Sequence, residues 1–315
     1  MSQQLSGRSE QSVPERFVPA EMQGELVELE HLARYEWAAT YATGKRVLDA
    51  GCGVGYGTAL LARSGALEAT GVDVAEPIIT AAGTEHQLTN AKFTVGDVTS
   101  LDFPDDSFDL IVCFEVIEHV EAQEKVFDEL TRLLAPEGVL LISSPNPESY
   151  PSGNPHHIRE LRPAELKGEL TKRFSSVQTL AQENWLVSAL FDEQTLQLED
   201  GSEIKGGLRA TKHQSRVPEF RTYTVCVASN ATLPQPELFG AFGPPTEVKR
   251  WLEIYREQDQ VLQEQRGEIT KQGIYYGDRG DEPLEELAGP VDVAGAEREV
   301  GEGAQREVEI GGCCT

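Results

Sequence analysis

Apolar and polar positions follow two different periods along the first part of the chain. Residues 24–43 carry apolar side chains at helical spacing, which predicts an amphipathic helix that ends near Gly44. The apolar positions of this helix are Leu26, Leu29, Leu32, Ala33 and Trp37. From residue 45 to 146, short apolar runs typical of strands take turns with amphipathic stretches typical of helices. Because such alternation builds a parallel sheet with helices on both faces, the predicted fold class is α/β, with a doubly wound sheet.

Residues 147–231 are predicted to carry the substrate loop, an insertion and the end of the sheet. A polar, proline-rich loop follows the fifth strand-like run and leads into a helix, with Pro163 near its first turn. Two further apolar runs, at 175–183 and 221–230, have the composition of strands, and a polar insertion near 184–220 separates them. Together with the five earlier runs, they predict a mostly parallel sheet of seven strands.

Beyond residue 231 the composition changes. We expect a linker at 232–245, a charged, glutamine-rich helix at 246–272 and a disordered acidic tail at 273–315. An apolar residue recurs every seven positions in the helix, but the second row of a coiled-coil seam is mostly polar. The repeating positions are Val248, Tyr255, Leu262 and Ile269. A solvated single helix and a helix that forms a homo-oligomer are both open.

Charge and cysteine content narrow the function. Acidic residues outnumber basic ones by 53 to 27 in 315 residues, so the formal net charge is -26 and nucleic acid is a disfavoured partner. No stretch approaches the roughly 20 apolar residues that span a bilayer, and the amino terminus lacks an apolar signal run, so we expect a cytoplasmic protein. The 5 cysteines are scattered without a C-x-x-C pair, which argues against a disulfide framework and a thiolate zinc site.

The strongest candidate site is a strand that runs into a glycine-rich turn, V-L-D-A-G-C-G-V-G-Y-G at 47–57. Its glycines let the backbone approach a ligand closely. The spacing G-x-G-x-G departs from the dinucleotide fingerprint G-x-G-x-x-G, which counts against a nicotinamide-dependent oxidoreductase. Acidic residues lie at the carboxyl ends of four successive strands, where they should line one crevice and favour a cationic ligand over a pyrophosphate. These residues are Asp49, Asp73, Asp97 and Glu115.

Together with Gly96-Asp97 and the run F-D-L-I-V-C-F-E-V-I-E-H-V, these features resemble the successive motifs of class I S-adenosylmethionine-dependent methyltransferases, over roughly residues 34–230. The resemblance implies a Rossmann-like sheet and S-adenosylmethionine as cofactor. It places the methionine moiety on Asp49 and the loop, the ribose on Asp73, and the adenine on Asp97 and the Val98 amide. The expected cofactor contacts are Asp49, Gly51, Cys52, Gly53, Gly55, Asp73, Val74, Asp97, Val98 and Glu115.

Two glutamates and a histidine follow the fourth strand directly. A helix that begins near Glu115 would place Glu115, Glu118 and His119 on one face, because their spacing is i, i+3 and i+4. Two carboxylates and an imidazole suit Mg²⁺ or Mn²⁺. The alternative is that the acids stabilise the start of a helix and that His119 packs in the core.

The stretch E-x-x-E-H also resembles small-RNA 2'-O-methyltransferases, where it binds metal with one further histidine, and ubiquinone-pathway O-methyltransferases. By that resemblance, His157 in the loop after the fifth strand is the candidate fourth ligand, which gives the set Glu115, Glu118, His119 and His157. Without a metal, His119 or His157 could act as the general base. The candidate catalytic residues are His119, His157 and Glu115.

The sequence therefore predicts a methyltransferase that acts on a hydroxyl of a sugar or another small metabolite. Methylation of an RNA terminal ribose is the first alternative, although the acidic composition speaks against it. The oxidoreductase is a second alternative. A third is a non-catalytic assembly module in which the helix at 246–272 carries the function.

Overall fold

The computed structural model describes residues 25–149, 154–184 and 222–235, with short stretches and single positions elsewhere. The predicted tail at 273–315 lies outside the described residues. Of the predicted helix at 246–272, only single positions between 254 and 262 are described, and these are helical and exposed. Most of the insertion near 184–220 and most of the segment before residue 25 also lie outside the described residues.

A sheet of seven strands forms the middle layer, in the order β3-β2-β1-β4-β5-β7-β6. The first five strands run parallel, and β7 pairs antiparallel with both β5 and β6. This confirms the predicted α/β fold and the mostly parallel sheet. The strands are β1 (Arg46–Ala50), β2 (Glu68–Asp73), β3 (Ala91–Val95), β4 (Phe108–Phe114), β5 (Leu134–Pro145), β6 (Ser176–Gln182) and β7 (Tyr223–Ser229).

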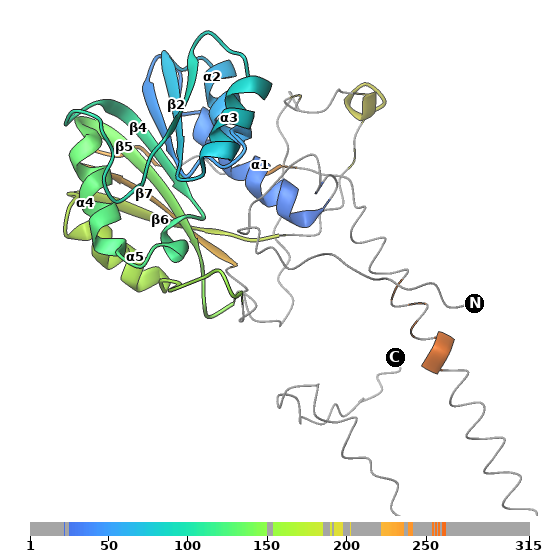
Figure 1. Ribbon diagram of the computed structural model, residues 1–315. Coiled ribbons are helices and arrows are strands. Elements are labelled where there is room, and N and C mark those ends of the chain that lie inside the picture. The colour runs from blue at the N-terminus through green and yellow to red at the C-terminus, as the bar shows by residue number, and fades with distance from the viewer. Residues whose placement is uncertain are drawn as a thin grey trace, which may run out of the picture. The chain divides into compact units, whose positions relative to one another are not determined.

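Helices cover both faces of the sheet (Figure 1). They are α1 (Leu26–Ala39), α2 (Tyr56–Arg63), α3 (Glu76–Glu85), α4 (Gln123–Leu133) and α5 (Pro163–Thr171), and Pro163 begins α5 as the sequence predicts. Successive residues of β5 point to opposite sides, so Leu140 and Ile142 join the core under α4 and α5, whereas Leu141 joins the core under α1 and α2. The strand order reverses between β1 and β4, and in such sheets ligands bind beyond the carboxyl ends of the strands at that point.

Helix α1 differs from its prediction in the face that it buries. The apolar positions expected to face the core, from Leu26 to Ala33, are only partly buried. The buried residues are Glu30, Arg34, Tyr35, Trp37 and Ala38. Two of these are charged, because they form polar contacts with β6 and β7 that a hydrophobic pattern cannot register.

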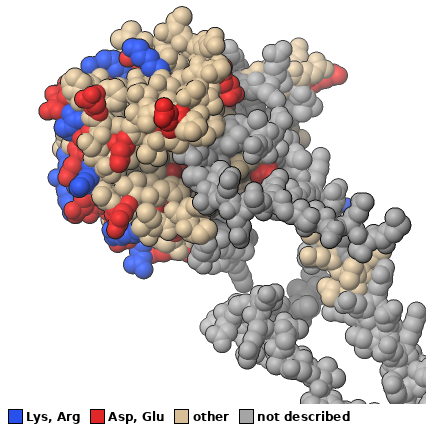
Figure 2. All heavy atoms as spheres, in the orientation of Figure 1, with Lys and Arg blue, Asp and Glu red and all other residues tan. Residues whose placement is uncertain are grey.

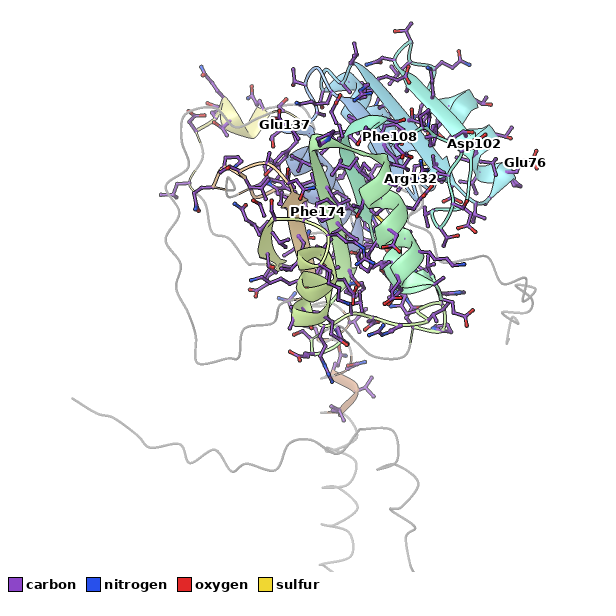
Figure 3. The ribbon with its side chains drawn as sticks, turned by 90° about the vertical axis from the view of Figure 1, so that its left-hand side faces the viewer. Glu76, Asp102, Phe108, Arg132, Glu137 and Phe174 are labelled. Carbon is purple, nitrogen blue, oxygen red and sulfur yellow. The ribbon has the colours of Figure 1, made fainter. Side chains whose placement is uncertain are left out.

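Arg132, at the carboxyl end of α4, fixes the segment that follows β3 (Figure 3). Its Nη1 donates to the carbonyl of Phe103 at 2.8 Å and to Asp105 Oδ1 at 2.6 Å. Glu129, one turn earlier, accepts from the Leu101 amide at 2.6 Å. These bonds hold the residues just after Asp97 in place against the sheet.

The surface carries charges of both signs. Figure 2 shows Asp and Glu side chains interspersed with Lys and Arg, and no continuous basic stripe crosses the described residues of that face. Among the helices that the structure describes, none is long and apolar enough to cross a membrane.

Candidate active site

The glycine-rich loop between β1 and α2 turns by means of left-handed backbone conformations. Gly51, Gly53 and Gly55 have φ angles of 87°, 52° and 82°, which residues with a Cβ atom rarely adopt. At Gly51 a Cβ atom would also lie 2.3 Å from Val116 Cγ2. The amides of Gly51 and Cys52 both donate to the Val72 carbonyl, at 2.8 and 2.9 Å, so the loop is tied to β2. Glycine is therefore required here by conformation and by space.

Asp49, the acid at the end of β1, lies beneath this loop. It is 1% exposed, and its carboxylate accepts from Thr58 Oγ1 at 2.6 Å and from the Tyr35 hydroxyl at 2.9 Å. Burial raises the pKa of Asp49 to about 6, although the hydrogen bonds from Thr58 and Tyr35 favour the charged form. Tyr35 in turn packs so closely on Gly57 that a Cβ atom there would lie 2.2 Å from the Tyr35 ring. Helix α1 thus supports the loop from below.

The other predicted cofactor residues follow the ends of β2 and β3. Asp73 accepts from the amides of Gly53 at 3.2 Å and Ala75 at 2.9 Å, so it joins the glycine loop to the end of β2. Asp97 is exposed two residues after β3, where its Oδ1 accepts from the Thr99 amide and hydroxyl. Val98 is buried, whereas Val74 is 69% exposed. The structure therefore brings these residues to one edge of the sheet, and their roles toward the cofactor stay predictions.

Glu115 shows where the sequence prediction was wrong about local structure. No helix begins at this residue, because Glu115 has a φ angle of 56°, and only a single 3-10 turn follows, over Ile117–His119. Its Oε1 accepts from Ser143 Oγ at 2.6 Å. Burial raises the pKa of Glu115, whereas the nearby Arg34 guanidinium opposes the rise. The left-handed turn directs Glu115 away from the two residues with which it was expected to share a face.

Glu118, His119 and His157 do come together. One ligand atom from each residue lies within 4.8 Å of the others, and Glu115 is not part of this group. Glu118 is fully buried, and neither carboxylate oxygen has a hydrogen-bond partner. Burial and the neighbouring charge of Glu115 raise the pKa of Glu118 well above its usual range. A buried acceptor group without a donor is costly, so this carboxylate is suited to receive a cation or a proton.

Both histidines of this group are oriented through their Nδ1 atoms. Nδ1 of His119 lies 3.0 Å from the His156 carbonyl, which can only accept, and Nδ1 of His157 lies 2.6 Å from Glu160 Oε1. A ring that donates from Nδ1 in its neutral form presents a lone pair at Nε2, which can bind a metal or take a proton. The amides of residues 158 and 159 donate to the Glu118 carbonyl, at 2.8 and 3.2 Å, and this holds the second loop against the first.

Several residues of this region were missed at the sequence level. Tyr35, Thr58, Ser143 and Glu160 position predicted site residues, and their contacts are set by the tertiary fold. Arg34 was missed because an apolar pattern was sought in α1. The signal that could have revealed it is the pair Glu30 and Arg34, one helical turn apart on the same face.

Comparisons with known proteins agree with this geometry. Residues 48–142 match the family model described as a methyltransferase domain. The chain is 36% identical over 157 residues to a probable S-adenosylmethionine-dependent methyltransferase of Mycolicibacterium smegmatis, covering 48% of this chain and 60% of that one. It is 35% identical over 141 residues to a similarly named protein of Mycobacterium tuberculosis, covering 43% of this chain and 50% of the other. A ubiquinone biosynthesis O-methyltransferase of Coxiella burnetii is 37% identical over 105 residues, which cover 33% of this chain and 44% of the relative. The chain thus matches about half the length of these relatives.

Proposed function

We propose that this chain, whose residues 48–142 form a class I S-adenosylmethionine-dependent methyltransferase domain, transfers a methyl group from S-adenosylmethionine to a hydroxyl of a sugar or another small metabolite. The glycine loop and the carboxylate of Asp73 support the donor, since they lie at the sheet edge where α/β folds bind ligands. The observation that carries the choice of a hydroxyl acceptor is the group of Glu118, His119 and His157 beside that edge.

The reaction is a direct displacement. The acceptor oxygen attacks the methyl carbon, the carbon–sulfur bond breaks, and its electron pair stays on sulfur, which leaves S-adenosylhomocysteine. The hydroxyl proton must go to a base, and His119 or His157 can take it through Nε2. Because the sulfonium methyl is already reactive, the protein's main contribution is to align the two reactants.

The same three residues fit a divalent metal ion. Glu118 supplies two buried oxygens without hydrogen-bond donors, and the Nδ1 contacts of both histidines turn Nε2 into the available ligand atom. We propose that Glu118, His119 and His157 hold Mg²⁺ or Mn²⁺, with Glu115 outside the ligand set. When bound, such an ion lowers the pKa of an acceptor hydroxyl.

The metal proposal is tested by titrating the protein with Mn²⁺ and measuring heat and electron paramagnetic resonance. We expect Glu118→Gln to lose most of the affinity, at least about tenfold, because a buried anionic ligand is removed. Glu129→Gln is the matched control, since Glu129 lies in α4 and pairs with Arg132. Equal Mn²⁺ affinity in the wild-type protein and Glu118→Gln would contradict the metal site and leave the histidines as candidate bases.

The acceptor is tested with methyl-labelled S-adenosylmethionine and fractionated cell extract, with and without a chelator. Label in a sugar, glycan or small-metabolite fraction would support the proposal, and its loss with chelator would support the metal. Label in RNA would favour the RNA alternative instead. Cofactor binding without any labelled product would favour the assembly module, whereas binding of a nicotinamide cofactor in its place would favour the oxidoreductase.

A further inference from the structure

Arg34 of α1 is a buried cation with unused hydrogen-bond donors. The residue is 3% exposed, and its Nη1 donates to Gln182 Oε1 at 2.7 Å. Its guanidinium carbon lies 4.6 Å from the centre of the Tyr223 ring. Its Nε and Nη2 have no hydrogen-bond partner. Two charged donors that are removed from water and left unbonded are costly, so their position calls for a ligand that accepts hydrogen bonds.

The acidic residues around Arg34 do not supply that acceptor. Glu30, one turn earlier in α1, accepts from the Tyr223 hydroxyl at 2.7 Å and from the Asn184 side chain. Glu115 interacts with the charge of Arg34 but accepts its hydrogen bond from Ser143. A guanidinium that served only to join α1 to β6 and β7 would use more of its fork than the bond to Gln182.

The place of Arg34 matches one end of the cofactor. The predicted ribose and adenine contacts, Asp73 and Asp97, follow β2 and β3, on one side of β1. Glu115 follows β4, on the other side of β1. An extended S-adenosylmethionine with its nucleoside over β2 and β3 therefore directs its amino-acid end toward Glu115 and Arg34. That end carries one carboxylate and one ammonium group, and this pair of residues carries the two opposite charges.

We propose that Arg34 binds the carboxylate of the methionine moiety through Nε and Nη2, and that Glu115 binds the ammonium group. The inference rests on the proposed function, since it takes S-adenosylmethionine as the cofactor. It assigns a binding role to α1, which lies outside the segment matched by the methyltransferase family model. The two edges of the guanidinium fork suit the two oxygens of a carboxylate.

Calorimetric titration with two probes tests this assignment. S-adenosylhomocysteine contains the amino-acid end, whereas 5'-methylthioadenosine lacks it and keeps the nucleoside. We expect Arg34→Gln to weaken binding of S-adenosylhomocysteine by about 10- to 100-fold, since a charge-assisted contact is lost. Binding of 5'-methylthioadenosine should change by less than about threefold, because its contacts lie on the other side of β1. Glu115→Gln should show the same selective loss.

Arg173→Gln is the matched control, because Arg173 is also a partly buried arginine packed on an aromatic ring, that of Phe127, on the opposite face of the sheet. It should leave both affinities unchanged. Circular dichroism checks the fold, and if Arg34→Gln does not fold, Arg34→Lys provides the second variant, with a smaller but still selective loss. An unchanged ratio of the two affinities in a folded Arg34 variant would overturn the assignment alone. Failure of the wild-type protein to bind either probe would overturn the proposed function as well.

Discussion

Replacing Asp49 with asparagine should change how stability depends on pH. The carboxyl group is 1% exposed, and burial raises its pKa from 3.8 to about 6. Between these two values the folded protein keeps the proton, whereas the unfolded chain releases it. The free energy of unfolding contributed by this group therefore falls as the pH rises through the window, by about 1.4 kcal/mol per pH unit. Above pH 6 both states are ionised, and the loss stays constant at about 3 kcal/mol.

Asparagine has nearly the same shape and does not titrate. The Thr58 and Tyr35 hydroxyls can still bond to it, because a hydroxyl both donates and accepts. Relative to the wild-type protein, Asp49→Asn should thus gain about 2 kcal/mol between pH 4.5 and pH 7.5, whatever its stability at the lower pH. All other acids titrate in both proteins, so they cancel in the difference.

Urea unfolding of both proteins without cofactor, at pH 4.5, 5.5, 6.5 and 7.5, measures this difference. The gain should be nearly complete by pH 6.5. Parallel stability curves over the whole range would refute the argument that burial governs the ionisation of Asp49. A difference that moves in the opposite direction would mean that the two hydroxyl donors outweigh burial.

Three further predictions concern the loop and the core. Asp73→Asn should weaken S-adenosylhomocysteine binding by about 1.5 to 3 kcal/mol in a calorimetric titration, and wild-type affinity would show that the ribose lies elsewhere. Gly51→Ala should lower both the melting temperature and cofactor affinity, because its methyl group meets Val116 at 2.3 Å, whereas Gly83→Ala in α3, with open space around it, should be neutral or mildly stabilising. Phe127→Ala should destabilise the fold by about 3 to 5 kcal/mol in urea, since the ring is 1% exposed, and a loss below about 1 kcal/mol would mean that the core closes over the cavity.

The sequence was sufficient for the elements of the fold and for the edge of the sheet that carries the site. Each strand has a continuous apolar run, and the glycine turn has a distinctive spacing, so both are encoded locally. The antiparallel placement of β7 between β5 and β6 follows from no local pattern, because it depends on long-range pairing.

Side-chain roles were predicted less well for the same reason. Glu118, His119 and His157 were expected together, and they are together, whereas Glu115 departs because a left-handed residue interrupts the expected helix. Glutamate seldom adopts this conformation, so helical spacing gave no warning of it. Arg34 is buried through contacts with residues about 150 and 190 positions further along the chain. No window of the sequence contains those partners.

The pairing of β6 with β7 has a consequence for how this protein family can diversify. The last paired positions, Gln182 and Tyr223, face each other, so the chain between them leaves and re-enters the sheet at neighbouring points. Their contacts with α1 place these points beside Arg34. The entropy of closing a loop grows only logarithmically with its length, at roughly 0.6 kcal/mol for each doubling. Evolution can therefore lengthen, shorten or exchange residues 183–222 at little thermodynamic cost, and so change what is presented next to a conserved cofactor site while the sheet stays intact.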